Sequence, residues 1–126
     1  MSDTIFYQKL VRDRIPEIIR NHGKNPRTRI LGQAEFKEAV AAKIIEEVHE
    51  LYREWKQCNS KGILKESADL LEILLSALNE YGFTLDDLLA MRQKRETDRG
   101  GFKQKIFLER VGDEHFFQRI FSRIRF

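Results

Sequence analysis

Three carboxylates, those of Glu46, Glu47 and Glu50, lie close together in the apolar-rich stretch IIEEVHELYREW at residues 44–55. Acids in such a stretch can serve as charges on a solvated helix face, or as hard oxygen ligands for a cation such as Mg²⁺ or Mn²⁺. Most single acids are solvated, and Lys43 can pair with Glu47 at a spacing of one helical turn. This stretch alone leaves both interpretations open.

A second acidic pair, Glu66 and Asp69, follows in the next predicted helix. Helical geometry places Glu66 inside the apolar stripe of that helix and Asp69 on its edge. Glu47 and Glu50 lie beside the stripe of the first helix, and Glu46 lies further toward solvent. Because helices joined by a short turn pack antiparallel, four of these carboxylates should meet at one seam. Their mutual repulsion predicts a bound Mg²⁺ or Mn²⁺.

Apolar residues at helical spacing predict the elements that would hold these acids. The expected helices are PEIIRN, a long helix from Gln33 to about Lys56, a second from about Ile63 to Tyr81, and a third that ends near Asp98. Gly82 suits the end of the second helix. Thr84, with Asp87 three residues later, suits the start of the third as a capping box.

The remaining segments give weaker signals. FKQKIFLERV alternates weakly, as a strand would, and a short extended piece is expected at residues 28–31. The tail DEHFFQRIFSRIRF repeats apolar residues at helical spacing. We therefore predict an all-α antiparallel helix bundle with at most one short β-hairpin. Residues 1–112 would form the domain, and residues 113–126 an amphipathic helical extension.

Composition narrows the class of protein. The chain has 126 residues, of which 41% are hydrophobic and 34% charged, as expected of one helix-rich globular domain. A net charge of +3 suits an anionic small ligand. The single cysteine, Cys58, cannot form an internal disulfide, and the N-terminal region has no long apolar stretch. We expect a cytoplasmic protein with neither a signal peptide nor a membrane partner.

Several motifs resemble one enzyme family. EEVHE, followed after 15 residues by ESAD, resembles the EExxE…ExxD signature of the MazG-like nucleotide pyrophosphohydrolases, which belong to the all-α NTP pyrophosphatase superfamily. More narrowly, KLVRDRIPEII, KIIEEVHEL, LLEILLSAL…YGFTLDDL and RGGF resemble the phosphoribosyl-ATP pyrophosphohydrolase-like branch. The resemblance runs from about residue 5 to residue 110. The EExxE piece alone would be a weak signal, because helices are rich in Glu, but both acidic motifs in order with these flanking motifs make a strong one.

The resemblance implies a site and a reaction. Mg²⁺, or Mn²⁺, would be held by the carboxylates of both motifs, at Glu47, Glu50, Glu66 and Asp69. Glu46 or Glu47 is the candidate base that activates water. The enzyme would cleave a nucleoside triphosphate between its α and β phosphates, as a house-cleaning activity, and would act as a homo-oligomer, a dimer or tetramer. Beyond the shared acids the chain carries no motif of the histidine-pathway enzyme, so the base and sugar of the substrate stay open.

Phosphate charge that the metal does not offset needs cations. The candidates are Lys9, Arg12, Arg14, Lys94, Arg95, Arg99 and Lys103. Arg12 and Arg99 are the strongest of these, because both lie in the motifs that carry the resemblance. Two other functions fit the composition: a non-enzymatic helical oligomer with solvated acids, and a nucleic-acid-binding module with a basic tail. We expect a nucleotide as the partner, and no nucleic acid.

Overall fold

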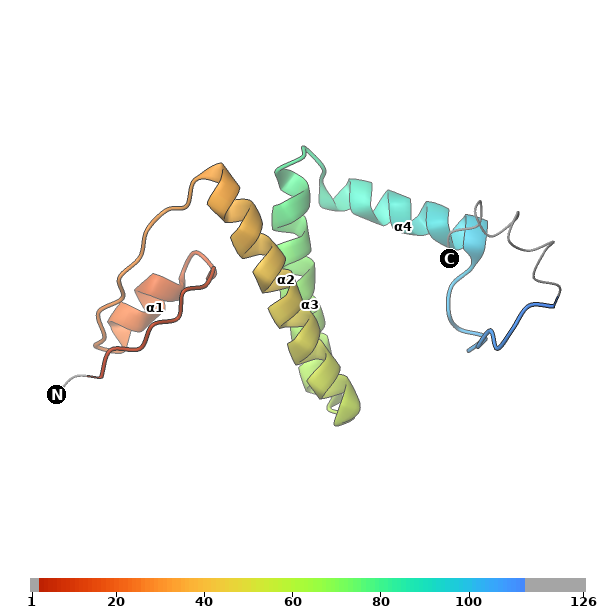
Figure 1. Ribbon diagram of the computed structural model, residues 1–126, viewed down its shortest axis with the longest axis horizontal. Helices are drawn as coiled ribbons and strands as arrows, with labels where there is room; N and C mark the ends of the chain where they lie inside the picture. The colour runs from red at the N-terminus through yellow and green to blue at the C-terminus, as the bar shows by residue number, and fades with distance from the viewer. Residues whose placement is uncertain (1–2, 113–126) are drawn as a thin grey trace. The chain divides into compact units, whose positions relative to one another are not determined.

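The computed structural model describes residues 3–112, and within them the secondary structure is entirely helical. The helices are α1 (Ile15–Asn21), α2 (Gln33–Lys56), α3 (Ser60–Asn79) and α4 (Leu85–Arg99) (Figure 1). The predicted all-α class is therefore confirmed. The predicted helical extension at residues 113–126 lies outside the described residues. The chain divides into two units, Met1–Leu88 and Leu89–Phe126.

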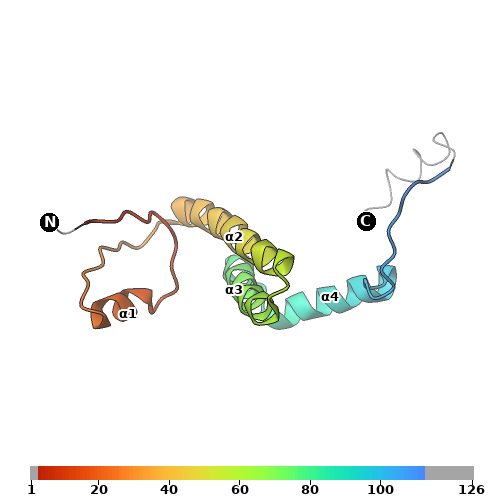
Figure 2. The ribbon, with the colours of Figure 1, turned by 90° about the horizontal axis from the view of Figure 1, so that it is seen from below.

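Helices α2 and α3 form a hairpin and lie side by side in both views (Figures 1 and 2). Asn59 is the N-cap residue of α3, and its side-chain oxygen accepts a hydrogen bond from the Gly62 backbone N–H at 3.3 Å. The Asn59 amide in turn donates to the Glu54 carboxylate at 2.7 Å. A Cβ atom at Gly62 would meet that carboxylate, so a larger residue at this position would require the Glu54 side chain to move.

The hairpin buries few apolar side chains. Among the described residues, Val40 on α2 and Ile73 on α3 are the apolar residues less than a tenth exposed, at 7% and 8%. Helical spacing in the sequence places Val48 and Trp55 on the apolar stripe of α2, but the structure leaves these residues 48% and 66% exposed. The helical spacing was right, but a single partner helix covers only part of the stripe.

Helix α1 starts and stops as its sequence suggests. Pro16 lies in its first turn, where a missing backbone N–H costs nothing. Gly23 follows its end with φ +75°, a conformation that glycine adopts without strain. Arg14 occupies the N-cap position and makes no side-chain cap hydrogen bond.

The predicted capping box at the start of α4 is present. The Thr84 backbone N–H donates to the Asp87 carboxylate at 2.8 Å, and the Asp87 backbone N–H donates to the Thr84 hydroxyl at 3.3 Å. Gly82, at φ +79°, turns the chain between α3 and α4. None of the helices in the described part of the chain is long and apolar enough to cross a membrane.

The predicted strand at FKQKIFLERV is wrong. Within residues 3–112 the structure has no strand there or at residues 28–31. Lys105 has φ +56°, and its backbone N–H donates to the Phe102 carbonyl at 3.1 Å, so a turn interrupts the stretch. A weakly alternating stretch also needs a neighbouring strand to satisfy its backbone, and the described residues offer none.

Candidate metal centre

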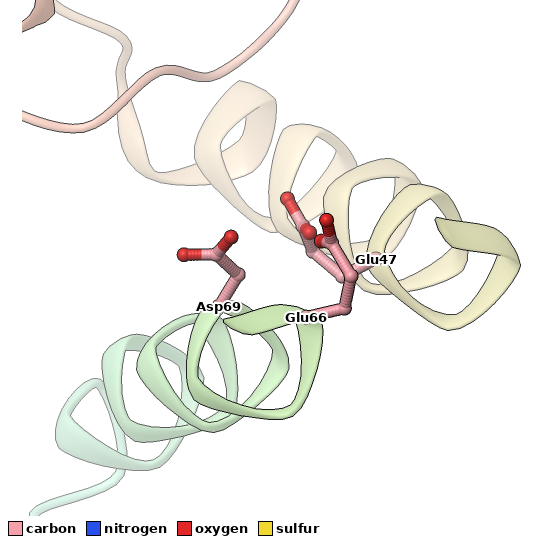
Figure 3. A group of neighbouring side chains, drawn as sticks. All are labelled: Glu47, Glu66 and Asp69. Carbon is pink, nitrogen blue, oxygen red and sulfur yellow. The ribbon is translucent and has the colours of Figure 1, made fainter. Parts of the chain in front are cut away.

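Three acids from α2 and α3 come together between the two helices. Glu47 projects from α2, and Glu66 and Asp69 project from successive positions one turn apart on α3 (Figure 3). One carboxylate oxygen from each lies within 4.8 Å of the others. Ligands on opposite sides of a Mg²⁺ ion are separated by about 4.2 Å, twice the usual Mg–O distance. Small side-chain adjustments would therefore let all three residues bind one ion.

Burial distinguishes Glu47 and Glu66 from ordinary helix carboxylates. Their residues are 5% and 6% exposed, and the Oε2 atom of each has no hydrogen-bond partner among residues 3–112. A buried charged oxygen without a partner is costly. A hard divalent cation would satisfy both oxygens at once, and an all-carboxylate donor set suits Mg²⁺ or Mn²⁺. The residues present therefore fit the metal.

Two lysines on the same helices already contact the acids. Lys43 lies 3.2 Å from a Glu46 oxygen and 3.0 Å from Glu47 Oε1. Lys65 lies 2.9 Å from Glu66 Oε1 and 3.3 Å from Asp69 Oδ2. Desolvation opposes the charge of Lys43, but hydrogen bonds to Glu47 and Glu46 raise its pKa. Lys65 was not predicted as a site residue, although its place one turn before Asp69 was a usable signal.

The segment before α1 adds two further cations. Lys9 Nζ lies 3.1 Å from Glu46 Oε1, and Arg12 Nη2 lies 2.6 Å from Asp69 Oδ1. Desolvation acts to raise the pKa of both carboxyls, but hydrogen bonds from Lys9 and Lys43 lower the pKa of Glu46. Hydrogen bonds from Arg12 and Lys65 lower the pKa of Asp69. Both side chains are therefore ionised at neutral pH.

Glu50 lies at the margin of the group. It is half-buried and is not one of the three residues whose oxygens come within 4.8 Å. Desolvation, followed by the negative charges of Glu47 and Glu66, raises the pKa of Glu50. The acids thus repel one another, and a bound cation would be stabilised because it relieves this repulsion.

Comparison with known families decides the relationship. The family model for phosphoribosyl-ATP pyrophosphohydrolase matches residues 8–96. The chain belongs to this family. The family lies within the MazG-like nucleotide pyrophosphohydrolases, and its members are hydrolases that act on phosphoric anhydrides. The matched range contains every acid of the cluster and both cations of the segment before α1, so the resemblance read from the motifs is confirmed.

One curated relative shares part of the chain. An uncharacterised protein of Mycolicibacterium smegmatis is 54% identical over 43 residues, which are 34% of this chain. The matched part covers 44% of that relative, so the chain spans less than half of its length. No solved structure matches the chain.

The other predicted phosphate-binding residues of this phosphoribosyl-ATP pyrophosphohydrolase homologue have different neighbours. Arg14 pairs with Glu17 on α1 at 3.2 Å. Lys94 pairs with Asp98 on α4 at 2.8 Å. The remaining three are exposed in the unit Leu89–Phe126, namely Arg95, Arg99 and Lys103. Of the seven predicted cations, Lys9 and Arg12 are the two seen, within the described residues, to pair with predicted site acids: Lys9 with Glu46 and Arg12 with Asp69.

Proposed function

We propose that the chain hydrolyses a nucleoside triphosphate between its α and β phosphates, giving a nucleoside monophosphate and pyrophosphate in a house-cleaning role. The observation that carries the proposal is the pair of unpartnered buried oxygens, on Glu47 and Glu66, beside Asp69. Membership of a pyrophosphohydrolase family supports the reaction type. Mg²⁺, with Mn²⁺ as a substitute, is the proposed cofactor, bound by these three acids and Glu50.

The proposed chemistry divides the acids by exposure. A bound divalent cation offsets phosphate charge and makes water more acidic. Glu47 is the more buried of the two candidate bases and belongs to the three-residue cluster, so we assign it to the metal. The Glu46 side chain is 29% exposed, ionised and adjacent, which suits the base. Water adds to phosphorus, the bond to the bridging oxygen breaks, pyrophosphate leaves, and Glu46 accepts the proton.

The proposed enzyme is a homo-oligomer. An apolar groove of about 380 Å³ lies along the α2–α3 hairpin, lined by Val48, Leu51, Tyr52, Trp55, Ile63 and Ser67. Exposure of such a groove to water is unfavourable at roughly 1.5–3 kcal/mol for each large side chain that could otherwise be buried. We propose that a second copy of the hairpin covers it and completes a bundle, as a dimer or as half of a tetramer.

The two alternative functions predict that these acids are exposed to solvent. A non-enzymatic oligomer or a nucleic-acid binder would carry them as solvated charges, whereas Glu47 and Glu66 are buried. The cytoplasm, where nucleotides are abundant, is the proposed location, and the exposed thiol of Cys58 is compatible with reducing conditions.

Phosphorus NMR of the reaction tests the function. A panel of nucleoside triphosphates is incubated with the full chain and Mg²⁺, and in parallel with a chelator. We expect pyrophosphate and a nucleoside monophosphate from at least one triphosphate, and no reaction in the presence of the chelator. Stepwise release of orthophosphate through a diphosphate would contradict it. Glu96→Gln, which alters an exposed acid on α4, is the matched control for Glu47→Gln.

A further inference from the structure

The acids of the metal centre are nearly neutralised by protein cations. Five carboxylates and four cations are involved: Glu46, Glu47, Glu50, Glu66, Asp69, Lys9, Arg12, Lys43 and Lys65. A divalent ion that entered without any rearrangement would convert this small negative excess into a positive one. A bound divalent ion would repel these cations, which favours a new partner for at least one of them.

The oxygens that these cations contact show which cation would have to change partner when the metal binds. Oε1 of Glu47 and Oε1 of Glu66 contact lysines, which leaves Oε2 of each without a partner. Asp69 differs, because Arg12 holds its Oδ1 at 2.6 Å and Lys65 holds its Oδ2 at 3.3 Å. A metal that uses Asp69 meets a cation at whichever oxygen it approaches.

The two cations on Asp69 are attached to the protein differently. Lys65 is one turn away on α3 and also holds Glu66 Oε1. Arg12 comes from the segment before α1, and its side chain is 54% exposed, so it can turn away without disturbing either helix. Lys9, from the same segment, pairs with Glu46 on α2 and keeps Arg12 close to the site.

We propose that Arg12 is an exchangeable counter-ion: it neutralises Asp69 while no metal is bound, and moves to a phosphate of the substrate when the metal takes that carboxylate. The inference rests on the proposed function and deepens it. A guanidinium suits the exchange, because its planar set of N–H donors matches a carboxylate and a phosphate equally well. The metal weakens the hold of Asp69 on Arg12 and brings phosphate oxygens within its reach.

The exchange couples the two ligands. Arg12 competes with metal in the absence of phosphate and binds phosphate in its presence, so removing it has opposite effects on the two affinities. Phosphate draws Arg12 from Asp69 and thereby favours the metal, and the metal favours phosphate by the same factor. A residue that only oriented Asp69 would weaken both affinities when removed.

Calorimetry with Mg²⁺ alone, on the full chain, is the first test. Arg12→Gln should bind Mg²⁺ about three- to tenfold more tightly than wild type, the size expected from losing one competing ion pair. The matched control is Arg29→Gln, which breaks the exposed pair of Arg29 with Glu35 and should leave the affinity unchanged. Equal or weaker Mg²⁺ binding by Arg12→Gln, with wild-type helicity by circular dichroism, would overturn the proposal.

Pyrophosphate, titrated into protein saturated with Mg²⁺, is the second test. Arg12→Gln should bind it about tenfold more weakly than wild type or Arg29→Gln, because a charge-assisted contact is lost. Unchanged or tighter pyrophosphate binding would overturn the proposal. The proposed function and the exchange can fail separately. If the wild-type protein binds no Mg²⁺, the proposed function is wrong. If the wild-type protein binds Mg²⁺ and pyrophosphate and Arg12→Gln binds both with the same affinities, only the exchange is wrong.

Discussion

Helix α4 and the α2–α3 hairpin carry the same charge pattern with different consequences. On α4, Lys94 lies 2.8 Å from Asp98 four residues later, and no residue of that helix is buried. On α2, Lys43 lies 3.0 Å from Glu47 at the same spacing, but Glu47 is 5% exposed and one of its oxygens has no partner in the described part of the chain. The spacing produces an ion pair in both places. Burial against a second helix is what turns the pair on α2 into part of a candidate site.

The largest expected effect comes from changing a buried acid of the α2–α3 hairpin. Glu66→Gln should reduce pyrophosphate release by about 100-fold or more, because it removes a proposed metal ligand. The same change should raise the melting temperature of the metal-free protein by roughly 4 °C, because relief of the repulsion between Glu66 and Glu50 outweighs the loss of the ion pair with the exposed Lys65. Glu96→Gln on α4 should alter neither quantity. An apo Glu66→Gln protein that melts well below wild type would show that Glu66 has a structural role instead.

Added Mg²⁺ should stabilise the folded protein through the buried acids alone. At a hundred times the dissociation constant, mass action adds about 2.7 kcal/mol to the free energy of unfolding. Differential scanning calorimetry should show this gain for wild type and for Asp98→Asn, and a much smaller one for Glu47→Gln. A full gain in Glu47→Gln would place the metal elsewhere.

The apolar groove offers a second contrast between the two regions. Trp55→Glu should lower the sedimenting mass, because it places a charge in the proposed contact between hairpins. Burial of the Trp55 side chain there would stabilise the contact by about 2 kcal/mol per copy. Met91→Glu changes an equally exposed apolar residue on α4, 56% exposed against 66% for Trp55, and should leave the mass unchanged. The same mass for wild type and Trp55→Glu would exclude this groove as the subunit contact.

The smallest effect concerns the capping box at the start of α4. A backbone hydrogen bond and then a side-chain hydrogen bond from Thr84 lower the pKa of Asp87 below the ordinary value of an aspartate. Because the folded pKa is the lower one, this stabilisation is complete above the unfolded pKa and disappears as pH falls through the folded pKa. NMR should show the first turn of α4 fraying over that range in wild type. In Asp87→Asn the turn should be frayed already at neutral pH, and an identical pH course in both proteins would contradict the assignment.

Local signals accounted for most of the fold. Pro16, Gly23, Gly82 and the Thr84–Asp87 box mark helix ends through backbone chemistry that depends on few neighbours. The strand at FKQKIFLERV failed because a strand depends on a partner that its own residues do not specify. The exposure of Trp55 was missed for a related reason, since helical spacing shows which side of a helix is apolar and not how much of it another element covers.

The candidate site was predictable where it depends on helix geometry. Glu66 was identified by its place inside an apolar stripe, and the structure buries it. Cations were harder, because a long side chain pairs with whichever acid is nearest. Arg14 lies in a family-like motif yet pairs with Glu17 three residues later, whereas Arg12 reaches Asp69 on a distant helix. Sequence spacing indicates contacts along one helix, and the contact of Arg12 required the tertiary structure.

Anomalous diffraction from crystals soaked in Mn²⁺ tests the central claim most directly, because Mn²⁺ substitutes for Mg²⁺ and can be located by its own scattering. We predict an anomalous peak for Mn²⁺ between α2 and α3, within reach of carboxylate oxygens of Glu47, Glu66 and Asp69, and no such peak in Glu66→Gln. Crystals in which Mn²⁺ binds only exposed acids, such as those of α4, while the oxygens of Glu47 and Glu66 stay without a ligand, would contradict it.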